Sequence, residues 1–475
     1  MTSHEVSDLS SRSREILISV SRSSPRPLGR QIEESIRNAI RDGRLRSGAA
    51  LPSTRDLSNE LGVSRPVVMG AYEQLAAEGF VVLRQGAFAR VSARAVQRQN
   101  SRQEPVASND PHHDLRPAVP DLSSFPRKTW LKAMREVLSR MAHAELGYTD
   151  LHGAAVLRHA LTEYLGRVRG VQADPGQIFI TSGFVQARAI LCRALAARSG
   201  ATRIAVETPG YNDLSFARQA GMRPCGVPVD EQGMQIARLA KTRARIVMVT
   251  PAHQFPTGAV MSGSRRAQLL SWLRDHDALA IEDDYDSEFR YDHAPVGALQ
   301  GLEPNRVIYA GTASKTLAPA LRLGWMVVPV HLIDSVRAVQ ADTDYGSPRI
   351  EQHSFAHLLK SGEFDRHVRR MRSIYRARRD AMVDALAREL PEAQLLGIAA
   401  GLHVTVRLPA SDNLSRIRSE AQRRGLAFDL LSDYSPLGGD FPPAILLGYA
   451  RHSEEGITRA VRELAMIVRA RRKPA

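Results

Sequence analysis

Short apolar runs alternate with longer amphipathic segments through the middle of the 475-residue chain, and this alternation most constrains its fold. The apolar runs stand at 178–181, 203–207, 246–250, 278–283 and 307–310. Strands that alternate with helices typically form a parallel sheet with helices on its faces. The chain is therefore predicted to contain an α/β domain built on such a sheet.

Polar residues follow these runs, at the carboxyl ends where parallel sheets bind ligands. Ser182 and Gly183 come directly before a predicted helix, whose first amide groups favour an anion. Thr312, Ser314 and Arg322 follow the last run and add two hydroxyl groups and a guanidinium group. Amides, hydroxyls and an arginine are the donors that a phosphate group needs. A phosphate site is therefore predicted at this edge of the sheet.

Lysine is rare in this chain, with six lysines against 59 arginines, and Lys315 stands within the same stretch. Its amine can react with an aldehyde. Asp283 supplies a carboxylate for a pyridinium nitrogen, and Tyr285 shares its side of the strand whereas Asp284 points away. Tyr211 supplies an aromatic ring that can stack on a heteroaromatic ring. Together these residues predict a site for pyridoxal 5′-phosphate (PLP) bound as a Schiff base.

Each of these residues also has a purely structural interpretation. Taken alone, Lys315 fits a surface lysine, Tyr211 a core aromatic residue and Asp283 a helix or loop cap. Their occurrence in order, each at the end of a predicted strand, favours the cofactor site over three unrelated structural roles.

The N-terminal part predicts three short helices and a hairpin. Residues 28–45 carry leucine or isoleucine at every fourth position, which is the spacing of one helix face. Ser53 begins a capping-box pattern for a second helix, and Ser64 is predicted to cap a third. The apolar runs 80–83 and 88–91 are predicted to pair as a hairpin. This order of elements is that of a winged helix-turn-helix.

In such a domain the third helix enters the major groove of DNA by its N-terminal end. Ser64 and Arg65 stand at that end, and Thr54 and Arg55 begin the preceding helix. Arginine binds guanine through two hydrogen bonds or contacts phosphate, and serine reaches either. By position alone, these arginines are equally consistent with solvated surface residues in an arginine-rich chain.

The segment 51–81 resembles the DNA-binding domain of GntR-family regulators, and the resemblance extends over residues 25–92. It rests on Leu51-Pro52-Ser53-x-Arg55, Leu61-Gly62-Val63-Ser64-Arg65 and Ala71-Tyr72-x-x-Leu75-x-x-Glu78-Gly79. The resemblance implies a double-stranded DNA operator as partner. It implies that Thr54, Arg55, Ser64 and Arg65 bind DNA, together with Gly86 in the wing. The second glycine of the family's wing is replaced by Phe88, so the wing is expected to contact DNA differently.

Residues 114–475 resemble fold-type I PLP-dependent aminotransferases. The stretches that resemble, more specifically, the MocR/GabR subgroup of GntR-family regulators are 116–121, 181–186, 249–258, 282–291 and 311–325. In that subgroup a GntR-type domain is fused to an aminotransferase-like domain. The resemblance implies that the chain has this two-domain architecture and forms a homodimer.

The resemblance also implies roles for the residues at the strand ends. Lys315 would form the internal aldimine, Asp283 would contact the pyridine nitrogen and Tyr285 the ring oxygen. The residues implied to hold the phosphate are Thr312, Ser314 and Arg322, with Tyr211 stacked on the ring. Ser182 and Gly183 are added as cofactor-binding residues because they stand at the predicted helix start. Tyr148 is expected to add a phosphate contact from the partner subunit.

Three positions depart from working aminotransferases. Phe255 precedes Pro-Thr-Gly, where those enzymes usually have asparagine. No arginine precedes the apolar run at 444–449, and Arg451 follows it. Asp213 stands two residues after Tyr211, where an amino-acid-binding relative has arginine. A missing arginine removes the bidentate contact that fixes amino-acid substrates. The effector is therefore expected to be PLP itself or something other than a simple amino acid.

The predicted organisation is a flexible N-terminal tail over 1–24, a winged helix over 25–92, a linker over 93–113 and the aminotransferase-like domain over 114–475. His112 and His113 are adjacent in the polar linker without further ligands at suitable spacing, so no metal site is expected. Two cysteines exclude a disulfide-rich scaffold, and the N-terminus lacks the apolar core of a signal peptide. We therefore expect a cytoplasmic protein without membrane contact.

The net charge of +15 does not by itself locate a DNA-binding end. Residues 1–113 contain 16 arginines and 12 acidic residues, a net of +4, so the remaining +11 lies in the larger part. An arginine bias throughout the chain explains this distribution as well as a nucleic-acid partner does.

The main prediction is a homodimeric, PLP-dependent, DNA-binding transcriptional regulator. PLP, or an amine or amino-acid-derived effector that reacts at Lys315, would shift the arrangement of the DNA-reading domains. The alternative is a catalytically active aminotransferase that carries a DNA-binding module, and Phe255 and the missing arginine disfavour it. A third interpretation, a dimerisation scaffold without cofactor, leaves the Lys315 set without a role.

Overall fold

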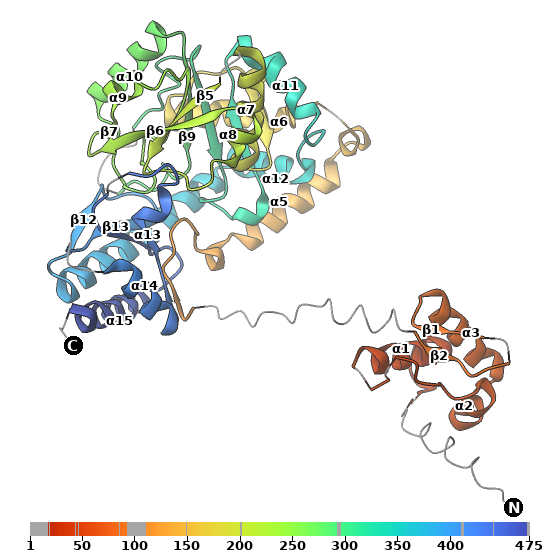
Figure 1. The fold of residues 1–475 in the computed structure, drawn as a ribbon. Helices are drawn as coiled ribbons and strands as arrows, with labels where there is room; N and C mark the ends of the chain where they lie inside the picture. Colours follow the sequence, from red (N-terminus) through yellow and green to blue (C-terminus); the bar gives the residue numbers. More distant parts are fainter. Residues whose placement is uncertain are drawn as a thin grey trace, which may run out of the picture. The chain divides into compact units, whose positions relative to one another are not determined.

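A computed structural model of the chain is shown in Figure 1. The residues that the structure describes are 18, 20–42, 44–45, 47–84, 86–92, 111–148, 150–199, 202–291, 296–409, 413–439 and 441–472. The chain divides into two compact units, Met1–Asn109 and Asp110–Ala475. Residues 1–17, 19 and 93–110, which make up most of the expected tail and linker, lie outside the described residues.

The first unit has the predicted winged helix-turn-helix. Its elements are α1 (Leu28–Arg41), α2 (Thr54–Leu61), α3 (Arg65–Ala77), β1 (Val81–Val82) and β2 (Arg90–Val91). The strands β1 and β2 pair antiparallel as a hairpin. Ile32, Ile36 and Ile40 form the fully buried face of α1, as their spacing predicts. Ser53 caps α2 by accepting a hydrogen bond from the Asp56 amide.

Two details of the first unit differ from expectation. Ser64 stands at the N-cap of α3, as predicted, but its side chain makes no capping hydrogen bond. Ile18 is buried and Val20 packs against the same core, so packed structure begins before residue 25. The Arg22 guanidinium group adds a hydrogen bond of 2.7 Å to the Gly62 carbonyl.

The second unit is built on a large sheet that contains, among the described residues, eight strands in the order β4-β11-β10-β9-β8-β5-β6-β7. Their bounds are β4 (Ile178–Thr181), β11 (Gly324–Val327), β10 (Val307–Thr312), β9 (Leu279–Asp284), β8 (Ile246–Val249), β5 (Arg203–Thr208), β6 (Arg223–Asp230) and β7 (Gly233–Met234). The five predicted runs correspond to β4, β5, β8, β9 and β10.

The sheet is not purely parallel, which corrects the sequence prediction. β11 pairs antiparallel with both β10 and β4, and β7 pairs antiparallel with β6. The physical reason at β11 is the short connection from β10, over residues 313–323, which returns the chain alongside the strand it has just left. A parallel neighbour requires a longer crossover to the other end of the sheet.

Helices cover both faces of this sheet because successive strand residues point to opposite sides. On β4, Ile178 and Ile180 pack with residues of α5, α6 and α12, whereas Phe179 packs with residues of α7, α8 and α11. The bounds are α5 (Arg127–Arg140), α6 (Ala155–Arg169), α7 (Phe184–Ser199), α8 (Ser215–Gln219), α9 (Ile236–Leu239), α10 (Gly263–Asp275), α11 (Ile333–Ala341) and α12 (Arg349–Lys360).

The C-terminal part forms a separate layer next to this sheet (Figure 1). An antiparallel sheet of order β12-β13-β16-β15 packs with three helices around its own apolar core. The bounds are α13 (Glu363–Glu389), β12 (Gln394–Leu396), β13 (His403–Arg407), α14 (Leu414–Arg423), β15 (Asp429–Leu430), β16 (Ala444–Gly448) and α15 (Glu454–Arg472). No helix in the described part of the chain is long and apolar enough to cross a membrane.

The start of the second unit is anchored in this C-terminal layer. β3 (His113–Asp114) pairs in parallel with β14 (Leu426–Ala427), so the last predicted linker residue is part of a strand. The Leu115 amide then donates to the Ala427 carbonyl at 2.8 Å. The chain therefore enters the second unit along a fixed path beside α14.

Candidate functional site

The polar residues predicted to form one site lie on turns after neighbouring strands of the large sheet. Thr312, at the end of β10, hydrogen-bonds through its hydroxyl oxygen to the Ser314 hydroxyl at 2.9 Å. The Ser182 hydroxyl, after β4, lies 3.4 Å from that of Ser347. β11 carries Gly324 directly against Gly183, where a Cβ atom on Gly324 would lie only 2.8 Å from the Gly183 Cα. These turns therefore meet without intervening side chains.

Arg322 reaches the same corner of the site. Its guanidinium nitrogens lie 3.4 Å from where a Cβ atom on Gly183 would stand. Its backbone is left-handed, with φ of 47°, at the end of a short 3-10 helix (Pro319–Leu321). Arg322, Ser182 and Ser314 thus bring together the types of donor that hold a phosphate group.

Lys315 follows Ser314 and points toward the chain that enters the second unit. Its Nζ atom donates a hydrogen bond of 2.5 Å to the carbonyl of Ala118. Burial lowers the pKa of Lys315, and Asp286 and Asp283 oppose that shift. A lowered pKa increases the neutral, nucleophilic fraction of the amine.

Asp283 and Asp284 point to opposite sides of β9, as the strand period predicts. The Tyr211 hydroxyl donates a short hydrogen bond to Asp283 Oδ2, and Asp283 Oδ1 is buried without a partner among the described residues. Burial, as the largest cause, raises the pKa of Asp283 to about 8. Asp284 instead binds Arg169 at 2.6 Å and accepts a hydrogen bond from Tyr309.

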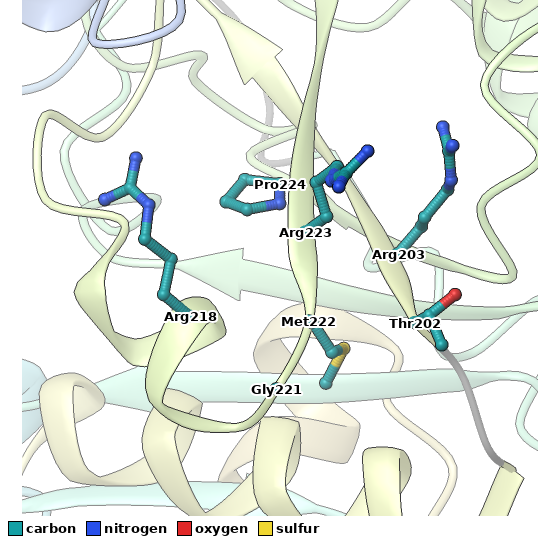
Figure 2. Close-up of a pocket in the computed structure, with 7 residues that line it drawn as sticks. All are labelled: Thr202, Arg203, Arg218, Gly221, Met222, Arg223 and Pro224. Atoms are coloured by element: carbon teal, nitrogen blue, oxygen red, sulfur yellow. The ribbon is translucent and has the colours of Figure 1, made fainter.

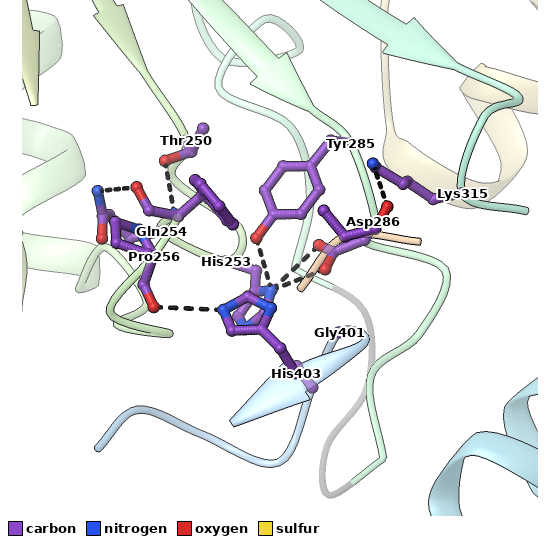
Figure 3. Close-up of polar contacts among 12 residues, drawn as sticks. Thr250, His253, Gln254, Pro256, Tyr285, Asp286, Lys315, Gly401 and His403 are labelled. Carbon is purple, nitrogen blue, oxygen red and sulfur yellow. Dashed lines mark hydrogen bonds and ion pairs between the residues drawn. The ribbon is translucent and has the colours of Figure 1, made fainter. Parts of the chain in front are cut away.

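A buried network surrounds Tyr285 (Figure 3). His253 Nδ1 lies 3.0 Å from the Tyr285 hydroxyl and 2.9 Å from Asp286 Oδ2. Gly401, from the C-terminal layer, packs closely against this histidine. A Cβ atom on Gly401 would be only 2.3 Å from His253 Cε1. The neighbouring His403 ring contacts the Pro256 carbonyl at 3.2 Å. The hydroxyl of Tyr285 is thus held by His253, whose ring is in turn held by Asp286.

Sequence reasoning did not assign a role to His253, Asp286 or His403. The available signals were the segment Pro251–Gly258 after β8 and the position of Asp286 next to Tyr285. Neither signal shows that the two side chains meet, because 32 residues of chain separate them. Their contact is a consequence of the parallel pairing of β8 with β9.

The side of the site beyond Lys315 is apolar. Phe255, Tyr434 and Leu446 belong to one buried cluster, and Ala118 packs against it. The rings of Phe255 and Tyr434 are 4.9 Å apart in a T-shaped arrangement. The site therefore has an aromatic wall beside its amine.

Arg451 and Asp213, which stand at or near the positions that differ from working aminotransferases, both form ion pairs within the chain. Arg451 forms a short ion pair with Asp114, next to the start of the second unit. Asp213 forms an ion pair of 3.0 Å with Arg188. Arg451 therefore does not replace the missing carboxylate-binding arginine.

Tyr148 lies apart from the other predicted residues. Its side chain is 92% exposed, and its ring makes a T-shaped contact with Tyr345 at 6.0 Å. Within the single chain it reaches none of the side chains described above. Its contact with a partner subunit stays a prediction.

The predicted DNA-binding residues lie together at the start of α2 and α3. The Arg65 side chain donates to the Thr54 hydroxyl at 3.2 Å, which joins the two helix ends. Arg55 and Ser64 are exposed beside them. Gly86 has φ of +76° in the turn between β1 and β2. The exposed end of α3 thus carries donors suited to bases or phosphates.

Comparison with known families accounts for both units. Residues 28–91 match the model of the bacterial regulatory proteins of the gntR family, and residues 118–462 match that of aminotransferase class I and II. The chain is 34% identical to the uncharacterized HTH-type transcriptional regulator YdeL of Bacillus subtilis (strain 168), over 92% of this chain and 96% of that protein. The chain belongs to the MocR-type GntR-family transcriptional regulators.

Two other MocR-type relatives match over similar lengths. The HTH-type pyridoxine biosynthesis transcriptional regulator PdxR of Corynebacterium glutamicum is 32% identical, over 93% of this chain and 96% of that protein. The probable rhizopine catabolism regulatory protein MocR of Rhizobium meliloti is 33% identical, over 89% of this chain and 90% of that protein. These full-length relatives support a regulator over an aminotransferase that carries an added DNA-binding module.

A solved structure shows the fold of the second unit. Pyrococcus horikoshii kynurenine aminotransferase, in complex with PMP, superposes with a TM-score of 0.69 at 26% identity. The match covers 77% of this chain and 93% of the enzyme. The second unit of this MocR-type regulator therefore has the fold of the class I and II aminotransferases.

Proposed function

We propose that this MocR-type regulator binds PLP at Lys315 and uses its aminotransferase-like domain as a sensor that controls operator binding in the cytoplasm. The observation that carries the proposal is that a half-buried amine at Lys315 occurs in the same site as a buried Asp283 oxygen that has no partner among the described residues. A buried acceptor without a partner is costly, so a donor from a ligand is expected there. The protonated ring nitrogen of PLP is such a donor.

The remaining residues fit the other groups of PLP. Arg322, Ser182 and Ser314 would hold the phosphate, and Thr312 would orient the Ser314 hydroxyl. Tyr285 would face the ring oxygen, held in place by His253. When bound, PLP supplies an aldehyde that condenses with an amine and a ring that withdraws electrons.

Tyr211 is proposed to stack on the ring. Its hydroxyl group donates to Asp283 Oδ2 in the structure, which leaves Oδ1, without a partner among the described residues, to accept from a pyridine nitrogen. The rings of Phe184 and Phe255 have centroids 5.8 and 6.1 Å from that of Tyr211. The phenol of Tyr211 therefore lies among aromatic rings.

PLP itself is the effector best supported by the residues present. The aromatic wall of Phe255 and Tyr434 stands beside Lys315, and Arg451 is paired with Asp114. A simple amino acid would find no guanidinium group for its carboxylate there. An amine without a carboxylate is the second candidate, because it needs only the amine chemistry of Lys315.

The homodimer and the role of Tyr148 belong to the same proposal. An exposed tyrosine that reaches no other site residue of its own chain suits a contact in the site of a second copy. A shared site would let PLP bias the relative arrangement of two DNA-binding domains, which requires a different affinity for each arrangement.

The test of PLP binding is the absorbance spectrum of the full-length protein. Adding PLP is expected to produce a new absorbance band near the visible range. Reduction with borohydride is expected to attach PLP irreversibly, so that the peptide containing Lys315 gains the mass of the reduced adduct. Lys315→Ala should lose both signals completely, whereas the control Lys241→Ala, at an exposed lysine, should keep them. A label on any other lysine, or no band in the wild type, overturns the proposal.

DNA binding by the first unit is tested at Arg65. Arg65→Ala is expected to lower operator affinity roughly 5- to 150-fold and to relax sequence preference at the contacted position. Arg376→Ala, at an exposed arginine of α13, is the control. An equal loss of affinity for operator and unrelated DNA would assign Arg65 to phosphate contact instead of base recognition.

A further inference from the structure

A second pocket lies at the amino ends of β5 and β6, at the other end of the strands from Lys315 (Figure 2). Its volume is about 610 Å³, and its lining residues are Thr202, Arg203, Arg218, Gly221, Met222, Arg223 and Pro224. None of these residues belongs to the cofactor site. Three of them are arginines, and Figure 2 shows their side chains extending in the same direction from their elements.

Strand register places two of these arginines side by side. Arg203 and Arg223 are direct partners in the parallel pairing of β5 with β6, so both side chains leave the same face of the sheet. Neighbouring strands are about 4.8 Å apart, and like charges opposite each other destabilise a sheet. Arg218 adds a third positive charge from α8. An anion would relieve this repulsion.

The three guanidinium groups form no close ion pair in the described part of the chain, although the charge of Arg218 acts on Asp213 at longer range. No carboxylate there lies within 4.0 Å of Arg203, Arg218 or Arg223, and the contacts of Arg203 are the Thr242 carbonyl at 3.4 Å and the Cys225 sulfur. Other arginines near this edge of the sheet do have acidic partners. Arg306 pairs with Asp277 at 2.8 Å, for example.

We propose that this arginine pocket binds backbone phosphates of DNA held by the winged helix. Guanidinium groups bind phosphate oxygens through paired hydrogen bonds and remain charged at every physiological pH. The covalent tether keeps DNA bound by the first unit at high effective concentration near the second.

The pocket contacts are expected to be independent of base sequence. Phosphate contacts fix the path of DNA without reading it, so recognition stays with the first unit. Each lost phosphate contact lowers the steepness of log K against log salt by about 0.9. Three contacts would therefore change the salt dependence in a measurable way.

The experiment compares two full-length triple variants with the wild type by operator binding between 50 and 200 mM salt. R203Q/R218Q/R223Q removes the pocket charges, and R376Q/R407Q/R416Q removes the same charge from exposed arginines elsewhere on the second unit. In the pocket variant, the slope of log K against log salt is expected to become less steep by up to about 2.7. Between 50 and 200 mM salt, its affinity should therefore change by a factor about 40-fold smaller than in the wild type. The control variant should keep a slope close to that of the wild type.

Two results would overturn the proposal. One is an equal slope for the wild type and both variants. The other combines two observations on the pocket variant: its salt slope for DNA binding equals that of the wild type, and inorganic phosphate no longer stabilises it against unfolding. This result would assign the pocket to a small phosphate ligand. If R203Q/R218Q/R223Q folds poorly, R218Q/R223Q keeps the Arg203 contact with Thr242 and should show about two thirds of the effect. The absorbance change with PLP is a separate readout, so failure here leaves the proposed function untouched.

Discussion

The charged residues at the carboxyl ends of the parallel strands in the large sheet differ in environment from those at the amino ends. At the carboxyl ends, Asp283, Asp284 and Glu282 are buried, and each has a partner within the chain. At the amino ends, Arg218 and Arg223 are exposed and have no acidic partner among the described residues. Burial makes an unpaired charge expensive, whereas water tolerates it. The carboxyl ends are therefore suited to a specific buried ligand and the amino ends to a salt-sensitive anion.

The largest effect is expected when the buried ion pair between Arg169 and Asp284 is broken. Arg169→Met leaves Asp284 charged and buried, so the free energy of unfolding should fall by about 3–5 kcal/mol. Urea denaturation of the full chain measures the change. The control Arg140→Met removes a partner of the exposed pair with Glu136 and should cost less than about 1 kcal/mol. Equal losses would show that the buried pair has no special role.

The second effect concerns the close contact between Gly401 and the His253 ring. Gly401→Ala drives a methyl group into the His253 ring, whereas Gly438→Ala, with a similar positive φ, meets no atom within 4 Å. Both changes strain the backbone, so their difference isolates the clash, which should cost about 1–3 kcal/mol of unfolding free energy. Affinity for PLP should fall in Gly401→Ala alone. A matching loss in Gly438→Ala would assign the effect to backbone strain.

The third effect concerns pH. Burial, as the largest cause, raises the pKa of Glu207 to about 7. Between the unfolded pKa and pH 7 the folded protein binds more protons at this carboxyl, so rising pH destabilises the wild type. Glu207→Gln removes this dependence. Relative to the wild type it should gain up to about 1.4 kcal/mol per pH unit from about pH 5 to 7.

Urea titrations at three pH values measure this difference. Glu231→Gln, at an exposed glutamate, serves as the control. A stability difference between Glu207→Gln and the wild type that does not vary with pH would contradict the account.

The smallest effect belongs to the amino ends. Arg223→Gln removes an exposed charge without an acidic partner in the described chain, so the free energy of unfolding should change by less than about 0.5 kcal/mol. Operator affinity should fall at low salt and recover relative to the wild type as salt rises. A stability loss above about 1 kcal/mol would show that this end of the strands is also part of the structural core.

Much of the fold could be predicted because its strands are buried on both faces. The strands β4, β5, β8, β9 and β10 are mostly apolar and are buried along almost their whole length, which is typical of parallel strands between helix layers. β6 was missed, because Pro224, Gly226 and Pro228 interrupt it and part of it is exposed. β11 was missed as well, because it is short and follows its neighbour too closely to be recognised as a separate run.

The sequence indicates candidate residues for the site but not the contacts among them. Lys315, Asp283 and Tyr285 stand out because each lies at the end of a predicted strand or soon after it. The contact of Lys315 with the Ala118 carbonyl joins residues 197 positions apart, and no local pattern encodes it. The arginine pocket was invisible for the same reason, because it depends on the register of β5 with β6.

The most direct test of the sensor is operator affinity measured across a titration with PLP. The account predicts that affinity of the wild type changes over the same PLP concentrations that produce the absorbance band. Lys315→Ala should show one affinity at every concentration. An affinity that stays constant in the wild type while the band forms would contradict the claim that PLP binding at Lys315 controls DNA binding.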